Sequence, residues 1–526
     1  MTLLVPTQPG VAAVDEAGDA GPDEAARRLW RRTWQRCVLV PFTVLAPLVA
    51  LAPTADHRFN LYWHGGLFRD DPIGIVPHTL HSVGGYLTLG NFRPLGRMLE
   101  KSLDLLAYTL GDLVGVPVTI PFRLVSFAAA AVLTVAAVVL AESVVARGPL
   151  FGRAPSTVAA TVPFAVGSGL VAAGLASPAV LFVGLYLLSA ALVLLVAAAA
   201  CRAVRRVGWW RGAALVAAGA TLAAFNEIAY LALPFATVAV AIRHRVVLGH
   251  RWRSIAGGPA ARTLGLLWLG FLPVFATVRL VIRAHCAAGG CYRGSDLAVG
   301  PGVVAAVPAR MVAWLPPLAW RSATVNAHRP WMLGAVTVLA LLALGALAWR
   351  AVRDLPRLTP VGRREAYGLA GAAGVLLALG ATLGSLNADV QHLVAQHRWG
   401  QGWRDTAVTA VAGGIALTAV ALAWSGPRRR AGLVVVLALA ATVSTAANKS
   451  YRDQLAVREP ALLANRVAGE MADFDRTAAG DARRCALRAE FRALYADSAF
   501  SLQRFDQSLD VAARQQAGVR FCEVTR

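Results

Sequence analysis

The chain has 526 residues, of which 57% are hydrophobic and 15% are charged, and its mean hydropathy is +0.56. A soluble domain usually carries about 25% charged residues, so the composition excludes an ordinary soluble enzyme. A net charge of +22 in a soluble protein would suggest nucleic-acid binding. Here the arginines lie in short segments between apolar runs, as the positive-inside rule predicts. We therefore predict an all-α polytopic membrane protein that binds no nucleic acid.

The N-terminal residues 1–36 are polar and lack the apolar core of a cleavable signal peptide. They end in the basic stretch RRLWRRTWQR, directly before the first apolar run. We predict a disordered, basic tail that holds the N-terminus in the cytoplasm.

Apolar runs long enough to cross a bilayer recur through residues 37–447 and predict a bundle of about 11 transmembrane helices. The stretch 212–242 could be one long helix, but Asn226 and Glu227 at its middle favour a tight turn between two short spans. The predicted spans are 37–53, 120–145, 156–175, 177–200, 212–225, 229–242, 263–283, 331–349, 366–386, 406–424 and 431–447.

Loop composition predicts which side of the membrane each loop occupies. The loops expected inside are rich in arginine, as in CRAVRRVGWWRG and SGPRRRAG. Three longer loops, 54–119, 284–330 and 387–405, are expected outside. The C-terminal stretch 448–526 has nearly as many acidic as basic residues and helical apolar spacing. We predict that it forms a small extracytoplasmic helical domain.

The six cysteines agree with this topology. Cys37 and Cys201 lie in or beside spans, where cysteine behaves as a small apolar residue. The other four fall in segments expected outside, where disulfides are stable. The predicted disulfides are Cys286–Cys291 and Cys485–Cys522.

The first outer loop carries the most informative pattern. The stretch GLFRDDPIG places two adjacent carboxylates, Asp70 and Asp71, soon after the first span. Further on, residues 94–110 have apolar side chains at helical spacing. They predict an amphipathic helix in the plane of the membrane interface, with Arg93 and its basic neighbours at the depth of lipid phosphates.

These elements resemble the GT-C glycosyltransferases, integral membrane enzymes that use polyprenyl-phosphate sugars. In the protein O-mannosyltransferase-like branch, an acidic residue of the first outer loop precedes an RPL element, an interfacial helix and the second span. Asp70, Asp71 and the tripeptide Arg93-Pro94-Leu95 are similar to these elements, and LAAFNEIAYLALPF around Glu227 is similar to an acidic motif of the middle spans. The His and Asn that these relatives often carry at the start of span two have no counterpart here.

The resemblance implies a GT-C-like fold and an inverting transfer. The donor would be a polyprenyl-phosphate sugar and the acceptor a glycan, lipid or protein of the cell envelope. The active site would face outward from a bacterial inner membrane, in contact with membrane lipids.

Such a transfer needs a base for the acceptor proton and cations for the departing phosphate. Asp70 or Asp71 is the predicted base. Glu227, Trp399 and Trp403 are predicted to line the substrate cavity, because aromatic rings stack on sugars. The candidate phosphate ligands are Arg93, Arg279, Arg283, His397 and Arg398.

Each of these candidates also has a purely structural explanation. In RDDP, Asp70 could cap a helix while Arg69 pairs with Asp71, and the arginines and tryptophans could anchor spans at the interface. The histidines of the first loop, His64, His78 and His81, match no zinc spacing, so we predict no metal site of that kind. No cofactor is predicted with certainty, and a divalent cation at Asp70 or Asp71 stays open.

Two other functions compete with the enzyme. One is a flippase or transporter of lipid-linked sugars without transferase chemistry, and the other is a structural or regulatory membrane protein. Transporters place ionisable residues near the midplane of related halves, and the chain has no second half resembling the first. An enzyme requires Asp70, Asp71, Arg93 and Glu227 to converge on one outward cavity.

Overall fold

The computed structural model describes residues 22–523, apart from 55, 205–206, 288, 290, 292–296, 326, 328–331 and 333. Within these residues the regular elements are helices, and no strand forms. In this described part of the chain, eight helical segments are long and apolar enough to cross a membrane. The predicted class, an all-α polytopic membrane protein, is confirmed. The segments are Thr119–Val145 (α6), Gly184–Cys201 (α8), Ala229–Val247 (with α10, Ala232–Ile242), Pro259–Ala287 (α12), Ala335–Arg357 (with α15, Ala335–Asp354), Arg363–Ser385 (α16), Thr406–Ala423 (α18) and Pro427–Ala456 (α19).

Three further predicted spans are helical but do not reach this standard. They are α1 (Pro22–Leu45), α7 (Val158–Gly169) and α9 (Trp209–Ala223). The last two are shorter than a span needs, and α1 carries arginines along its first half. Because α1 begins at Pro22, the prediction of disorder up to residue 36 is wrong for residues 22–36; the rest of that tail lies outside the described residues.

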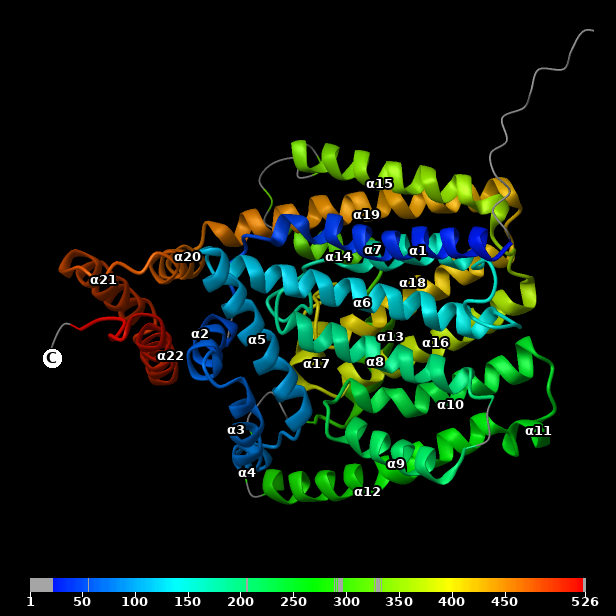
Figure 1. The fold of residues 1–526 in the computed structure, drawn as a ribbon, viewed down its shortest axis with the longest axis horizontal. Coiled ribbons are helices and arrows are strands. Elements are labelled where there is room, and N and C mark those ends of the chain that lie inside the picture. Colours follow the sequence, from blue (N-terminus) through cyan, green and yellow to red (C-terminus); the bar gives the residue numbers. More distant parts are fainter. Residues whose placement is uncertain are drawn as a thin grey trace, which may run out of the picture.

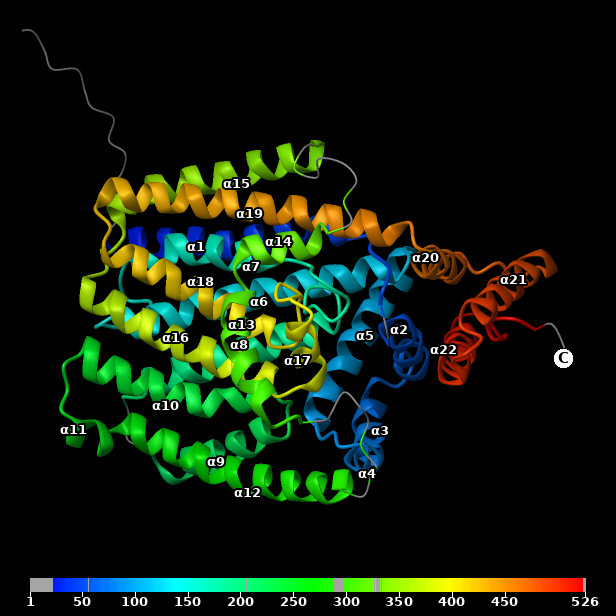
Figure 2. The same cartoon turned by 180° about the vertical axis from the view of Figure 1, so that it is seen from behind.

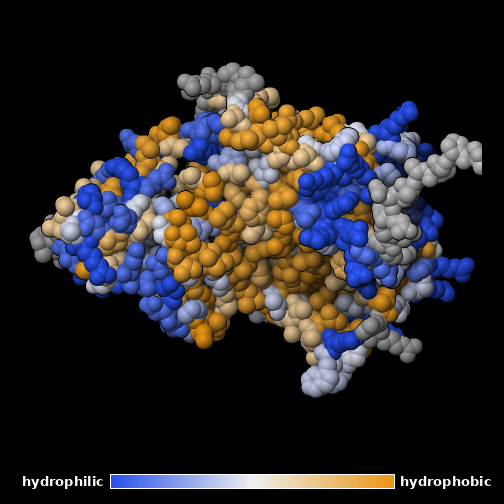
Figure 3. Space-filling view, turned by 45° about the horizontal axis from the view of Figure 1, so that its top comes forward, coloured by the Kyte–Doolittle hydropathy of each residue, from blue (hydrophilic) through white to orange (hydrophobic). Residues whose placement is uncertain are grey.

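The long helices form a bundle with two different ends (Figures 1 and 2). One end, here called the loop end, holds α2 (His57–Phe68), α3 (Ile75–His81), α4 (Val83–Thr88) and α5 (Pro94–Val114), followed by the C-terminal helices. The other end, here called the arginine end, holds the start of α1, the connections 146–157 and 424–427, and α11 (Trp252–Ala256). An apolar band separates hydrophilic surface at the two ends (Figure 3).

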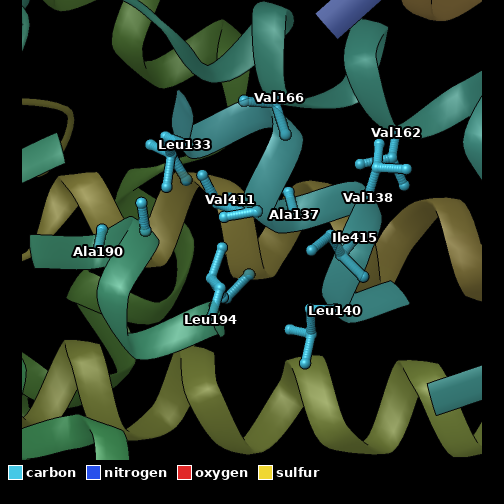
Figure 4. Packing of buried hydrophobic residues seen from close by; sticks show 14 of the residues in the cluster. Leu133, Ala137, Val138, Leu140, Val162, Val166, Ala190, Leu194, Val411 and Ile415 are labelled. Carbon is cyan, nitrogen blue, oxygen red and sulfur yellow. The ribbon is translucent and has the colours of Figure 1, made fainter. Parts of the chain in front are cut away.

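The bundle core is built mainly from alanine and branched aliphatic side chains. Figure 4 shows α6, α7, α8 and α18 meeting through residues such as Leu133, Val162, Leu194 and Ile415. Small side chains let these helices approach closely, and dispersion contacts between them hold membrane helices together where no hydrophobic effect acts between lipid and helix.

The helix predicted for residues 94–110 exists as α5 and runs across the end of the bundle (Figure 1). Its orientation differs from the prediction. Glu100, Lys101 and Asp104 are buried, whereas Leu106 and Leu113 are exposed. The polar face of α5 therefore lies against other parts of the protein, because α2 and α3 cover it on that side.

The predicted outer loop 284–330 also contains helical structure. Within it, α13 (Pro301–Ala313) and α14 (Pro316–Ala323) are apolar and bend by 92° at Trp314–Leu315. Arg310 of α13 is buried and binds Asp405 through two hydrogen bonds of 3.0 and 2.7 Å. This ion pair fixes the bent helix pair to the loop that precedes α18.

The C-terminal helices are α20 (Glu459–Ala472), α21 (Ala478–Leu494) and α22 (Ala499–Ala517). Because α19 continues to Ala456, they begin later than the predicted boundary at residue 448. They share one apolar core with α2 and α5, in which Phe59 and Tyr108 meet Phe491 and Phe505. Both predicted disulfides, Cys286–Cys291 and Cys485–Cys522, are present.

Candidate functional site

Helices α2 and α5 run side by side in the same direction and bring a row of polar side chains together. Asn60 donates to Glu100 at 3.1 Å, and His64 Nδ1 lies 2.8 Å from Asp104 Oδ2. The helices can approach because residue 65 is glycine; a Cβ there would lie 2.1 Å from a ring atom of Tyr108. The contact between α2 and α5 therefore buries two carboxylates, those of Glu100 and Asp104, in the first half of α5.

Burial controls the charge of this group. It raises the pKa of Asp104 well above its ordinary value and lowers the pKa of His64 to about 3. Burial therefore disfavours the charged form of both members of this hydrogen-bonded pair. The pKa of Glu100 is also raised, by burial first and by the neighbouring Asp104 second.

His57 lies beside this pair, with its Nδ1 3.7 Å from Asp104 Oδ1. Its ring packs against Phe122 and Phe182, and neither ring nitrogen has a hydrogen-bond partner among the described residues. Burial lowers the pKa of His57 to about 3, so the ring is neutral at physiological pH.

The start of α5 is fixed to the turn between α9 and α10. The backbone amides of Leu95 and Gly96 donate to the carbonyls of Ala224 and Phe225 at 3.2 and 3.1 Å. A Cβ at residue 96 would lie 2.4 Å from the Phe225 oxygen, so the glycine of RPLG is needed for this approach. The contact brings the guanidinium of Arg93 near the next acidic residue of the turn.

That residue is Glu227, whose Oε2 lies 3.8 Å from Nη1 of Arg93. Burial alone would raise the pKa of Glu227, but Arg93, Arg404 and Arg279 outweigh burial and hold it below its ordinary value. Arg279 also stacks on Tyr230, 5.0 Å from the ring centre. With 30% of its side chain exposed, Glu227 is a carboxylate that solvent can reach; Arg93 lies 3.8 Å away, and Arg404 and Arg279 are near enough to lower its pKa.

Next to Arg404 in the chain, Trp403 lines a cavity of about 410 Å³ at the loop end. Arg398 lines the same cavity, together with Asp389 and His392 of α17 (Ala388–Ala395). The cavity thus combines an aromatic ring with charged and hydrogen-bonding side chains, a composition suited to a sugar.

Other candidates from this loop lie elsewhere. His397 is exposed, and Trp399 donates its indole N–H to the Val394 carbonyl at 3.2 Å. Arg283 is exposed near the end of α12, away from Arg279 by one helical turn. None of these three residues lines the cavity.

The predicted convergence of all four motif residues on one cavity is wrong, because Asp70 and Asp71 are exposed at the opposite end of the α2–α5 pair. Asp70 accepts a hydrogen bond from Gln515 of α22 at 3.3 Å, and Asp71 caps the short helix Pro72–Gly74. Their neighbour Arg69 binds Asp112, 19 positions beyond Arg93 on α5. At about 1.5 Å per residue, this separation is about 28 Å.

The sequence pattern missed Glu100, Asp104 and the pairing of His64. A signal was present, since Glu100 and Asp104 are four residues apart on one face of a predicted amphipathic helix. Whether these two carboxylates are solvated or buried depends on which segments cover that face of the helix, and the sequence does not show this. No group of three or more His, Cys, Asp or Glu side chains among the described residues is arranged to hold a metal ion.

No family model, curated protein or solved structure matches this chain.

Proposed function

We propose that the protein is a membrane glycosyltransferase that moves a sugar from a polyprenyl-phosphate donor to an acceptor of the cell envelope. The observation that carries the proposal is the contact of Arg93 with the accessible carboxylate of Glu227, whose charge Arg404 and Arg279 also stabilise. Guanidinium groups bind phosphate oxygens in pairs and offset the charge that develops on a departing phosphate.

The requirement that Asp70, Asp71, Arg93 and Glu227 converge on one cavity is not met, so a transferase with an aspartate base is withdrawn. In the proposal made here, the base is Glu227, which lies 3.8 Å from Arg93. In the transfer, the acceptor hydroxyl attacks the anomeric carbon, the bond from that carbon to the phosphate oxygen breaks, and the hydroxyl proton passes to the carboxylate. A base must be ionised before it can accept a proton, and the lowered pKa of Glu227 meets this condition at neutral pH. Asp70 and Asp71 lie too far from the three arginines to serve one substrate with them.

The substrate would extend from the arginines toward the cavity that Arg398 and Trp403 line. Trp403 and Arg404 are adjacent in the chain, so phosphate and sugar sites would be neighbours. The polyprenyl chain would lie against the exposed apolar side chains of the bundle, such as Leu272 and Leu280 of α12.

The proposal includes the topology of eleven spans, with α1, α7 and α9 crossing beside the eight longer segments and the bent pair α13–α14 re-entering from the loop end. The loop end would then face outward from a bacterial inner membrane. Arginine-rich connections gathered at the opposite end support this orientation.

The test is donor turnover by purified protein with a panel of polyprenyl-phosphate sugars. Replacing Glu227 by Gln keeps the size of the side chain and removes its basicity, so we expect turnover to fall by a factor of about 10² to 10⁴. Asp70→Asn and Asp71→Asn are the matched controls, and both are expected to retain turnover near that of the wild type.

Two outcomes would contradict the proposal. Loss of turnover in Asp70→Asn or Asp71→Asn, with Glu227→Gln active, would move the base to the far end of α2. A second contradicting result would be no turnover with any donor, together with movement of a lipid-linked sugar between the leaflets of vesicles that contain the protein. That result would assign the protein as a flippase instead of a transferase.

A further inference from the structure

A second cavity lies at the arginine end of the bundle, far from Glu227. It occupies about 810 Å³ between the first half of α1 and the last turns of α15, and Phe151 of the α6–α7 connection closes one side. Nothing in the proposed transfer uses this cavity, since the candidate sugar and phosphate groups all lie at the loop end (Figure 1).

The walls of the cavity are strongly basic. Five arginines line it, and no acidic side chain does: Arg27, Arg31, Arg32, Arg36 and Arg350. One carboxylate lies beneath them. Asp354 is fully buried and binds Arg32 at 2.5 Å and Arg36 at 3.2 Å, so it neutralises one charge.

Several of these guanidinium donors have no hydrogen-bond partner in the part of the chain that the structure describes. Arg36 is 2% exposed, yet its Nε has no hydrogen-bond partner among the described residues. Arg31 and Arg350 are exposed and make no hydrogen bond or ion pair with described residues. A buried guanidinium N–H without an acceptor is costly, and an anion in the cavity would supply one.

The remaining wall is aromatic and apolar. Trp30 and Trp34 stack with ring centres 5.0 Å apart, and Phe151 meets Trp30 edge-on at 5.1 Å. Val38 and Leu39 continue the wall along α1 and are exposed where this helix enters the apolar band. The cavity is therefore basic at its outer part and merges with the lipid-facing surface of α1.

From this combination we infer that the cavity is a binding site for one acidic phospholipid of the surrounding bilayer. The phosphate group meets the unpartnered guanidinium groups, and the acyl chains lie along Val38, Leu39 and Leu347. A phospholipid fits better than a free anion because the apolar wall continues into the membrane, and tryptophan rings favour the headgroup layer.

The inference is tested by lipid retention. The full-length protein is placed in nanodiscs of phosphatidylcholine with a minor fraction of phosphatidylglycerol, and retained phosphatidylglycerol is measured by mass spectrometry after purification. The variant Arg31→Ala/Arg350→Ala removes two exposed side chains without other contacts, so it should fold. At about fivefold per arginine, we expect the apparent affinity for phosphatidylglycerol to fall by about 30-fold.

The matched control is Arg253→Ala/Arg428→Ala, which removes the same charge from exposed positions at the same end but outside the cavity. We expect it to retain phosphatidylglycerol like the wild type. Equal losses in both double variants would show general surface attraction and overturn the site. Displacement of the lipid by millimolar inorganic phosphate would overturn the assignment to a phospholipid. Because the readout is lipid retention, failure here leaves the transferase test unaffected.

Discussion

At the scale of single residues, His57 differs most from what its neighbours in the sequence suggest. A histidine directly after the first predicted span would be expected at a solvated surface. His57 is instead buried among aromatic rings, and neither of its nitrogens is hydrogen-bonded to a described residue. Burial lowers its pKa to about 3. The same desolvation that raises the pKa of Asp104 therefore lowers the pKa of His57 and keeps its ring neutral.

This burial predicts a pH dependence of stability. The pKa of His57 is about 3 in the folded state and about 6.5 when unfolded, so its contribution is complete above pH 6.5 and is lost as the pH falls toward 3. Between pH 7.5 and 5.0 the wild type should lose about 2 kcal/mol through this residue. His57→Phe should remove that part of the loss, as measured by thermal unfolding in detergent. Identical losses in both proteins would contradict the assignment of a neutral buried ring.

At the scale of elements, glycine decides how closely several helices approach. Helices α9 and α12 cross with almost no space between their backbones. A Cβ added at Gly270 would lie 1.8 Å from the carbonyl oxygen of Val216, and one added at Gly219 would lie 2.0 Å from that of Leu267. Small residues at such crossings are the usual device of membrane helix packing. The crossing positions α12, which carries Arg279, beside Glu227.

We expect Gly270→Ala to separate α9 from α12 and to cost about 1–3 kcal/mol, the usual range for overpacking. The measurement is again thermal unfolding in detergent. Gly265→Ala is the control on the same helix, since a Cβ there meets no atom within 4 Å. If both variants unfolded at the wild-type temperature, the close crossing would not exist in solution.

At the scale of the whole molecule, the C-terminal helices complete the loop end rather than form a separate unit. They pack on α2 and on the part of α5 around Tyr108. A cation–π contact of Arg58 with Tyr495, at 4.3 Å, adds to this shared core. The C-terminal helices, which are distant in sequence, thus help to hold α2 against α5. The row of polar side chains between α2 and α5 depends on the contact between these two helices.

The proposed orientation is tested by thiol labelling in intact cells. The native chain should not react, because Cys37 and Cys201 are buried and the other four cysteines form disulfides. A thiol introduced by Gln507→Cys, exposed on α22, should react with a membrane-impermeant maleimide. One introduced by Arg428→Cys, at the start of α19, should react only after permeabilisation. The reverse pattern would place the loop end in the cytoplasm.

The membrane class, the positions of most long helices and both disulfide pairs could be predicted from the amino-acid sequence alone. These features follow from local properties: an apolar helix satisfies its own backbone hydrogen bonds, so composition and length alone indicate a span. The existence of helix α5 was also predicted from the sequence, because its apolar side chains recur at helical spacing.

Which carboxylate meets Arg93 depends on contacts between distant segments and could not be predicted from the sequence. The motif RDDP looked like the centre of the site, yet Asp70 lies near Gln515 and the end of α5, and Arg93 meets Glu227 instead. The reason is the register of α2 on α5, which depends on the fit of Gly65 against Tyr108. Contacts between segments so far apart leave no periodic trace in the chain, so the buried His64–Asp104 pair emerged only when the helices packed.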